Sequence, residues 1–341
     1  MPKVTISDIA RRAGVSKTAV SFAFNDSSRL PEDTVQRILS VAEELGYIPN
    51  PIARSLSSNR TGNLGLLFPQ PLPHVMRNPY NAELLQGVGQ ACERSGYNVL
   101  LVSPVLGSIR QAVSGAVVDG FLTIGLEHYR PTIKLLDQRA VPYVMVDSEP
   151  FPGVACVNID DTAGAYQAMH HVLERKHRRI AILGIASGKR GRYKSYVGTL
   201  QGRIAGYQAA LAEIGLAIDD ENVRLFECAC THEGGRRGFD RCWRAMQPTA
   251  IITMADVLAA GALEAASAAS IPVPQRVSIV GFDDLPFTRL TNPPLTTIHQ
   301  PIHNKGEFAA NLLFDILNNG AELTQYVFPT HLVERETVAA V

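Results

Sequence analysis

Apolar residues in the first fifty positions recur at helical spacing in three short runs. The first run predicts a helix that Gly14 ends, and its inward face consists of Ile6, Ile9, Ala10 and Ala13. Ser16 is a suitable N-cap for a second helix over residues 17–24. A third helix is predicted from Pro31 to Leu45, and Gly46 closes it.

The spacing of Ala10, Gly14 and Val20 indicates how the first two helices meet. Two helices that cross steeply need a small residue at the contact, a glycine free to take positive φ in the turn, and an apolar residue pointing back. This is the helix-turn-helix arrangement, whose second helix projects its early side chains into the DNA major groove. A three-helix bundle without a DNA role is the alternative.

Beyond residue 62, short runs rich in leucine and β-branched residues alternate with amphipathic segments. The predicted strands are 64–68, 98–103, 120–125, 143–147, 179–184, 223–228, 250–254 and 277–282. The predicted helices are 81–95, 162–174, 203–214 and 257–269. Such alternation indicates parallel sheets with helices on both faces, here two doubly wound α/β halves with a cleft between them.

Between these two regions, the stretch NPIARSLSSNRTGN (50–63) combines a linker composition with apolar residues at helical spacing. Asn50 is a fair N-cap, and Pro51 suits the first helical position. An isolated helix of about eight residues is unstable in water because nucleation is costly. We therefore expect this helix to form only against a partner. A frayed linker with an incidental Leu56 is the alternative.

The composition is that of an ordinary globular protein, with 46% hydrophobic and 19% charged residues in a chain of 341. The N-terminal residues lack the apolar core of a signal peptide, and no run of 18 apolar residues occurs, so we expect a cytoplasmic protein without a membrane partner. The first 60 residues carry eight basic and six acidic side chains, a bias too weak to indicate nucleic acid alone.

Five scattered cysteines fit reduced thiols better than a disulfide framework. Cys228 and Cys230 lack a second cysteine pair at zinc-site spacing, so no metal site is expected. Residues 184–189 (GIASGK) follow a predicted strand, but only three residues separate the two glycines, and Arg190 stands where a phosphate loop needs serine or threonine. Neither G-x-S-x-G nor H-E-x-x-H occurs, so we expect no enzyme and no cofactor.

The segments VTISDIARRAGVSKTAVSFAFN and YIPNPIARSLSSNRTGNLGLLFP resemble the LacI/GalR family of bacterial transcription regulators through the first 68 residues. Further resemblance lies in NPYNAELLQGV, VDGFLTIG, HRRIAILG, GRIAGYQAAL, VSIVGFDDLP and NPPLTTIHQP. The resemblance implies an all-α helix-turn-helix domain over 1–48, a hinge helix and linker over 49–61, and an effector-binding and dimerisation core over 62–341.

That core resembles periplasmic binding proteins, in which two subdomains are joined by three crossings. The resemblance places the crossings near residues 160, 290 and 320. The N-subdomain is then expected at about 62–160 and 291–320, and the C-subdomain at about 161–290 and 321–341. No heptad helix follows the core, so we expect a homodimer rather than a tetramer.

In that family the hinge helix folds when two copies meet in the DNA minor groove. The resemblance implies that Ala53 packs against the sister hinge and that Leu56 wedges between base steps. The expected phosphate contacts are Thr5, Ser16, Ser21, Asn25 and Arg29. The positions that read base edges are Lys17, Thr18 and Phe22. Many relatives carry arginine or histidine at the third, and a phenyl ring can only touch a thymine methyl, so their operators are not transferable.

Ligands of doubly wound sheets bind at the carboxyl ends of the strands. By resemblance, the effector-site candidates are Asn81, Asp147, Arg203, Asp256 and Asp283. Carboxylates and a guanidinium can bracket sugar hydroxyls. Asn81 replaces an aromatic residue that stacks on a planar base in some relatives, which favours a polyol over a purine. Helix capping or ion pairing inside the cleft is the alternative role for Asp256 and Asp283.

The expected function is therefore that of a cytoplasmic, homodimeric DNA-binding transcriptional regulator, a repressor that binds a near-palindromic operator. A small-molecule effector, expected to be a carbohydrate, would control its DNA affinity from the core cleft. A solute-binding protein or an enzyme that shares the core fold is the alternative.

Overall fold

The computed structural model describes residues 4–49, 55, 60–126, 130–186, 193–320 and 322–341. It divides into two compact units, one of residues 1–63 with 117–119 and one of the remaining chain. Within the described ranges, no helix combines the length and apolar character needed to cross a membrane.

In residues 4–49, the described part of the first unit before the linker, three α-helices surround a small apolar core. Helix α1 spans Ile6–Ala13, α2 spans Lys17–Asn25 and α3 spans Glu32–Glu44, with a 3₁₀ turn, η1, at Ser27–Arg29. The predicted helices are confirmed. The inward side chains of Ile9, Val20 and Ile38 are fully buried.

The helix ends show why this sequence folds in this way. Thr5 donates hydrogen bonds to the Asp8 carboxylate from both its amide and its hydroxyl, at 3.1 and 2.7 Å, which fixes the start of α1. Gly14 ends α1 with φ of 66°, a left-handed conformation that glycine adopts without strain. Ser16 accepts a hydrogen bond from the Ala19 amide at 3.1 Å and starts α2.

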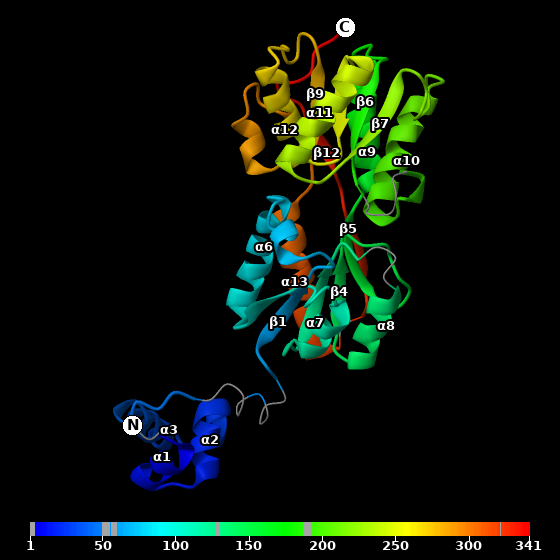
Figure 1. The fold of residues 1–341 in the computed structure, drawn as a ribbon. Coiled ribbons are helices and arrows are strands. Elements are labelled where there is room, and N and C mark those ends of the chain that lie inside the picture. The colour runs from blue at the N-terminus through cyan, green and yellow to red at the C-terminus, as the bar shows by residue number, and fades with distance from the viewer. Residues whose placement is uncertain (1–3, 50–54, 56–59, 127–129, 187–192, 321) are drawn as a thin grey trace. The chain divides into compact units, whose positions relative to one another are not determined.

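The second unit contains two six-stranded sheets, each flanked by helices (Figure 1). The first sheet has the order β11-β5-β4-β3-β1-β2, with β1 at Asn63–Leu67, β2 at Asn98–Val102, β3 at Gly120–Ile124, β4 at Tyr143–Val146, β5 at Ala155–Ile159 and β11 at Gln325–Phe328. The second has the order β12-β10-β9-β8-β6-β7, with β6 at Ile180–Ile185, β7 at Val223–Cys228, β8 at Ala250–Thr253, β9 at Ser278–Asp283, β10 at Thr296–His299 and β12 at His331–Val333.

Helices surround both sheets, as the alternating pattern predicts. The helices of the first half are α5 (Leu72–Val75), α6 (Tyr80–Ser95), α7 (Ile109–Gly115), α8 (Arg130–Arg139) and α13 (Ile302–Asn319). Those of the second half are α9 (Asp161–Glu174), α10 (Gly198–Ala212), α11 (His232–Met246) and α12 (Asp256–Ala268), with 3₁₀ turns η2 (Tyr193–Ser195) and η3 (Pro286–Arg289).

The chain passes between the halves three times. The first crossing, between β5 and α9, lies where the sequence places it, near residue 160. Strand β10 pairs in parallel with β9 of the second sheet, and β11 pairs in parallel with β5 of the first. The segment that returns to the first half therefore runs from Ile302 to Phe328. The expected limits of 291 and 320 both fall too early, because they ignore these two strands.

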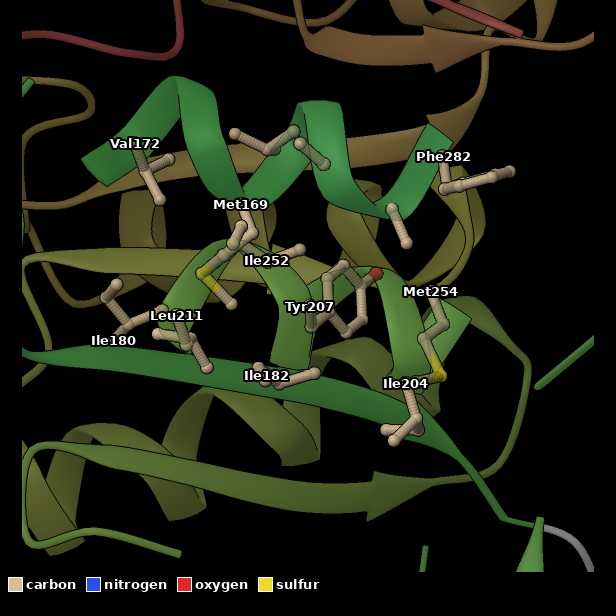
Figure 2. Close-up of a cluster of buried hydrophobic side chains, with 14 of the residues drawn as sticks. Met169, Val172, Ile180, Ile182, Ile204, Tyr207, Leu211, Ile252, Met254 and Phe282 are labelled. Carbon is tan, nitrogen blue, oxygen red and sulfur yellow. The ribbon is translucent and has the colours of Figure 1, made fainter. Parts of the chain in front are cut away.

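Close packing of α10 on α9 fixes the side chains that α10 presents. A Cβ atom on Gly206 would lie 2.2 Å from the carbonyl oxygen of Thr162, so only glycine permits this approach. Tyr207 is fully buried, and its ring lies among Ile182, Ile252 and Met254 (Figure 2). Burial of such a side chain contributes about 1.5–3 kcal/mol. Tyr207 therefore anchors α10 one turn after Arg203 in the same helix.

Candidate functional site

The candidate DNA-reading side chains lie on and beside α2. Ser16, Lys17 and Thr18 are exposed at the N-terminal end of that helix. Asn25, its last residue, is also exposed, and its amide donates to the Ser21 hydroxyl at 3.2 Å. The exposed positions can reach a groove or a phosphate without any change of fold.

Phe22 is half-buried on this face and is covered by a cation. The guanidinium of Arg29 lies 5.1 Å from the centre of the Phe22 ring. The same guanidinium pairs with Asp26, with Nε 2.7 Å from a carboxylate oxygen. Arg29 is therefore held by an aromatic face and a carboxylate in the free protein. Ala53 and Leu56, the expected hinge contacts, lie outside the described residues.

In the second unit, Asp147 lies at the centre of a buried polar cluster. It follows β4 in a left-handed conformation, with φ of 51°. The Lys305 ammonium, fully buried on α13, donates to Asp147 at 2.6 Å. The Tyr80 hydroxyl also donates to Asp147, and the Lys305 nitrogen lies 5.1 Å from the centre of the Tyr80 ring. A lysine tolerates such burial only when it is paired, so these three groups depend on one another.

Lys305 connects this cluster to Asp283 of the second half. Its ammonium donates to the Gln300 side-chain oxygen at 2.7 Å, and the Gln300 side-chain nitrogen donates to Asp283 at 2.6 Å. Gln300 lies in the second crossing, and Asp283 ends β9. Burial raises the pKa of Asp283 to about 6, although Arg203 and the Gln300 hydrogen bond act against that shift. A continuous polar chain thus joins the carboxyl ends of strands in both sheets.

Arg203 is 7% exposed, in the second turn of α10 rather than at its start. Its Nε donates to the Asp161 carboxylate at 2.8 Å, and another nitrogen donates to the Met254 carbonyl. The guanidinium carbon lies 3.6 Å from the centre of the Phe282 ring. Burial raises the pKa of Asp161, against the attraction of Arg203. This pair is the second cation and carboxylate pair of the cleft.

Asp256 and Asn81 are engaged by the protein's own groups. The fully buried Asp256 carboxylate accepts from the Leu285 amide at 2.9 Å and from the Thr297 hydroxyl at 2.5 Å. Burial raises its pKa well above the ordinary value. The Asn81 amide donates to the Val75 carbonyl at 2.7 Å. Asp256 therefore holds the segment after β9, a structural role that is neither the helix cap nor the ion pair weighed from the sequence.

The two halves also border a cavity of about 450 Å³, a volume that suits a small molecule. Its lining comes from the ends of β4 and β5 and from the start of α9 and α10, and it includes Ser148, Asn158, Asp161, Thr162 and Gly202. Asp161 belongs both to this lining and to the pair with Arg203. The cavity thus adjoins the Arg203–Asp161 pair directly, and its lining residue Ser148 follows Asp147 in the sequence.

The sequence did not single out four polar members of this cluster, namely Tyr80, Asp161, Gln300 and Lys305. Lys305 interrupts the apolar face of α13, which is a signal that a sequence can carry. Nothing in the sequence marks Gln300, because its role depends on the sheet that the preceding strand, β10, joins. One further contact spans the halves, since the Asn78 amide lies 3.5 Å from the Cys230 sulfur. Burial raises the pKa of the Cys230 thiol to about 12, so it is a neutral group here.

Comparison with known proteins extends over both units. A family model described as bacterial regulatory proteins, lacI family, matches residues 5–50, and one described as a periplasmic binding protein-like domain matches residues 169–338. The HTH-type transcriptional repressor PurR of Erwinia tasmaniensis is 34% identical over 346 residues, which cover 98% of this chain and 97% of that protein. PurR of Salmonella newport is 33% identical over 349 residues, with the same coverage.

Solved structures show the same architecture. A lac repressor dimer bound to operator and an anti-inducer has a TM-score of 0.83 at 22% identity, over 99% of this chain and 100% of that one. A complex of the transcriptional regulator CelR with cellobiose has a TM-score of 0.71 at 28% identity, over 98% and 100%. A LacI-family regulator from Enterococcus faecium with bound ribose has a TM-score of 0.71 at 22% identity, over 82% and 99%.

The two units of the structure and the full-length relatives indicate the same family. The chain belongs to the LacI family of bacterial regulatory proteins, and it is a DNA-binding transcriptional regulator rather than an enzyme.

Proposed function

We propose that this LacI-family regulator acts in the cytoplasm as a homodimeric repressor of a near-palindromic operator. The full-length relatives are named as repressors, and one structural neighbour is a dimer on operator DNA. A two-fold symmetric dimer reads two half-sites, so the operator sequence mirrors the symmetry of the protein. Lys17, Thr18 and Phe22 read base edges. Phosphates are contacted by Thr5, Ser16, Ser21, Asn25 and Arg29.

The Arg29 cation over the Phe22 ring supports a particular mode of base reading. With its face covered by a guanidinium, the ring has its edge left for contact, and a ring edge meets a thymine methyl better than a guanine edge. The half-site is therefore expected to carry an A·T pair where this residue docks.

Replacing Leu56 by alanine is expected to weaken operator binding about tenfold and to reduce DNA bending. A leucine that wedges between base steps opens the minor groove, and alanine is too short to do so. Gel-shift titration and bending measured by fluorescence transfer would test this on an operator selected in vitro. Thermal unfolding of the full chain is the control and should not change. Unaltered bending by the variant would contradict the wedge.

We infer that the effector is an uncharged, hydroxyl-rich molecule, as a sugar is. The observation that carries this inference is the pairing of charges in the cleft. Each buried cation already has a carboxylate, Lys305 with Asp147 and Arg203 with Asp161. Within the described residues, Asp283 forms no ion pair of its own, although Arg203 attracts it. A sugar hydroxyl can donate to such carboxylates, whereas an anion would be repelled. Cellobiose and ribose occupy two of the structural neighbours.

Control of DNA affinity then follows from linkage. An effector that prefers one arrangement of the two halves shifts the population toward it, and DNA binding prefers one arrangement as well. The coupling works through the crossings, where Gln300 bonds to both Lys305 and Asp283.

A thermal-shift screen of neutral sugars, sugar acids and nucleosides tests the effector assignment. A ligand at a hundred times its Kd stabilises the folded state by about 2.7 kcal/mol. For a core of this size, that raises Tm by about 5–10 °C. We expect shifts from neutral sugars and none from their acids. Stabilisation by the acids alone would contradict the charge argument.

A further inference from the structure

A single carboxylate holds the chain just after the expected hinge and linker. Asp119 accepts hydrogen bonds from the Thr61 amide at 2.6 Å, the Thr61 hydroxyl at 2.8 Å and the Gly62 amide at 3.0 Å. Both carboxylate oxygens take part. Hydrogen bonds to an ionised acceptor are stronger than neutral ones, so this is a firm attachment for a segment of two residues.

Further hydrogen bonds extend the attachment to Asn63 and to Val117. The Thr61 hydroxyl also accepts from the Asn63 amide at 3.1 Å, which closes a local turn. The Asp119 amide donates to the Asn63 carbonyl at 2.9 Å, and the Asn63 side chain donates to the Val117 carbonyl at 3.0 Å. We call the segments 61–63 and 117–119, joined in this way, the Asp119 clamp.

The clamp occupies a defined place in the sequence. Gly62 directly precedes β1, and Asp119 directly precedes β3. These strands pair in parallel, with Leu64 opposite Gly120. The clamp therefore closes at the start of two adjacent strands, and it lies at the C-terminal end of the expected 49–61 linker. None of the residues expected to contact DNA belongs to the clamp.

We propose that Asp119 is a positioning residue for operator binding, because its clamp fixes the C-terminal end of the 49–61 linker. The inference rests on the proposed binding of the operator through a hinge in that linker. A segment that folds only with its partner loses conformational entropy when it binds. Fixing Thr61 and Gly62 in advance leaves fewer residues to be ordered on binding, which removes part of that loss.

Limited trypsin digestion of the full chain tests the clamp directly, without DNA or effector. Trypsin cuts the Arg60–Thr61 bond only when the residues that follow Arg60 are released from the clamp. Asp119→Asn keeps the size of the side chain but removes its charge. We expect cleavage at Arg60–Thr61 to become about tenfold faster in this variant, since cleavage tracks the population of the opened state.

Cleavage at Arg54–Ser55 in the same molecules is the internal control, because that bond precedes the clamped residues. Its rate should not change. Mass spectrometry of the early fragments separates the two cuts. An unchanged ratio of the two rates between the wild type and Asp119→Asn would overturn the clamp.

Operator affinity tests the positioning role. Using a sequence selected in vitro with the wild-type protein, we expect Asp119→Asn to raise Kd about tenfold. We expect Thr61→Val, which removes one of the three bonds to Asp119 and the bond from the Asn63 amide, to raise it about threefold. Thr61→Ser keeps every bond and should restore wild-type affinity. Equal Kd values for all four proteins, together with faster cleavage of Asp119→Asn, would overturn the positioning role. Failure of the wild type to select any sequence would instead refute the proposed operator binding, and the digestion would still test the clamp.

Discussion

Replacing Arg203 by alanine is expected to lower the free energy of unfolding by about 3–5 kcal/mol and to abolish the effector response. Arg203 is 7% exposed and pairs with Asp161, which is equally buried, at 2.8 Å. Removing the cation leaves an unpaired carboxylate in a site where burial already raises its pKa. Urea denaturation measures the first effect, and the change in operator affinity on addition of the sugar found in the screen measures the second.

A double variant separates folding from ligand binding. Arg203→Met combined with Asp161→Leu removes both charges and fills the space with apolar atoms, an exchange that is often neutral or stabilising. We expect it to recover most of the stability of the core but none of the effector response. A double variant that responds normally to effector would show that Arg203 acts only in folding, and the cleft assignment would then be wrong.

The second large effect concerns pH. Asp283 has a pKa of about 6 in the folded protein, against an ordinary value of 3.8, because burial disfavours its charged form. The folded state then binds more protons than the unfolded state between pH 4 and 6, so this group makes the protein more stable as pH falls. The stabilising effect therefore develops as pH decreases from above 6 to below 4.

Asp283→Asn tests this contribution together with its effect on the nearby Asp256 carboxylate, whose pKa is raised by burial and by the charge of Asp283. Two buried histidines, His171 and His177, have pKa values lowered by burial, and they act in the opposite direction, since stability is lost as they charge at low pH. Both proteins contain these histidines, so their contribution cancels when the unfolding free energy of Asp283→Asn is subtracted from that of the wild type. We expect the variant to be the more stable protein at pH 7.5, and its advantage to vanish toward pH 4. A difference that does not change with pH would contradict the raised pKa.

Effector binding of the wild type should weaken below pH 6, because protonated Asp283 loses acceptor capacity.

Much of the fold could be predicted from the sequence, because a strong hydrophobic periodicity identifies a segment as a helix or a strand. All eight predicted strands are present, and β7 has the expected limits, Val223–Cys228. Four strands were missed, namely β5, β10, β11 and β12, and the last two lie at a sheet edge. Strand β11 has three exposed residues of four, and β12 has only three residues in all. Such edge strands owe their existence to pairing with distant segments, so periodicity does not reveal them. The second and third crossings were misplaced because β10 and β11 were missed.

The sequence predicts those site residues that directly follow a strand, because the carboxyl ends of the strands face the cleft. Asp147 and Asp283 lie at the carboxyl ends of β4 and β9, as the rule for doubly wound sheets requires. Asp256 also lies beyond a strand end, but the Leu285 amide and the Thr297 hydroxyl occupy it, and no sequence rule reveals that occupation. Lys305 comes from a helix that returns to the first half after β10, so its proximity to Asp147 depends on the topology as a whole.

The chain from Lys305 through Gln300 to Asp283 has a direction. The ammonium can only donate, and the ionised carboxylate can only accept, so the group between them must accept at one end and donate at the other. Among side chains of this length, the glutamine amide alone does both with opposite ends. Glutamate would repel Asp283, and lysine would repel Lys305. The crossing segment thus joins the two halves through one polar side chain with a fixed donor and acceptor end, and we expect a change of charge at Lys305 or Asp283 to affect the other through Gln300.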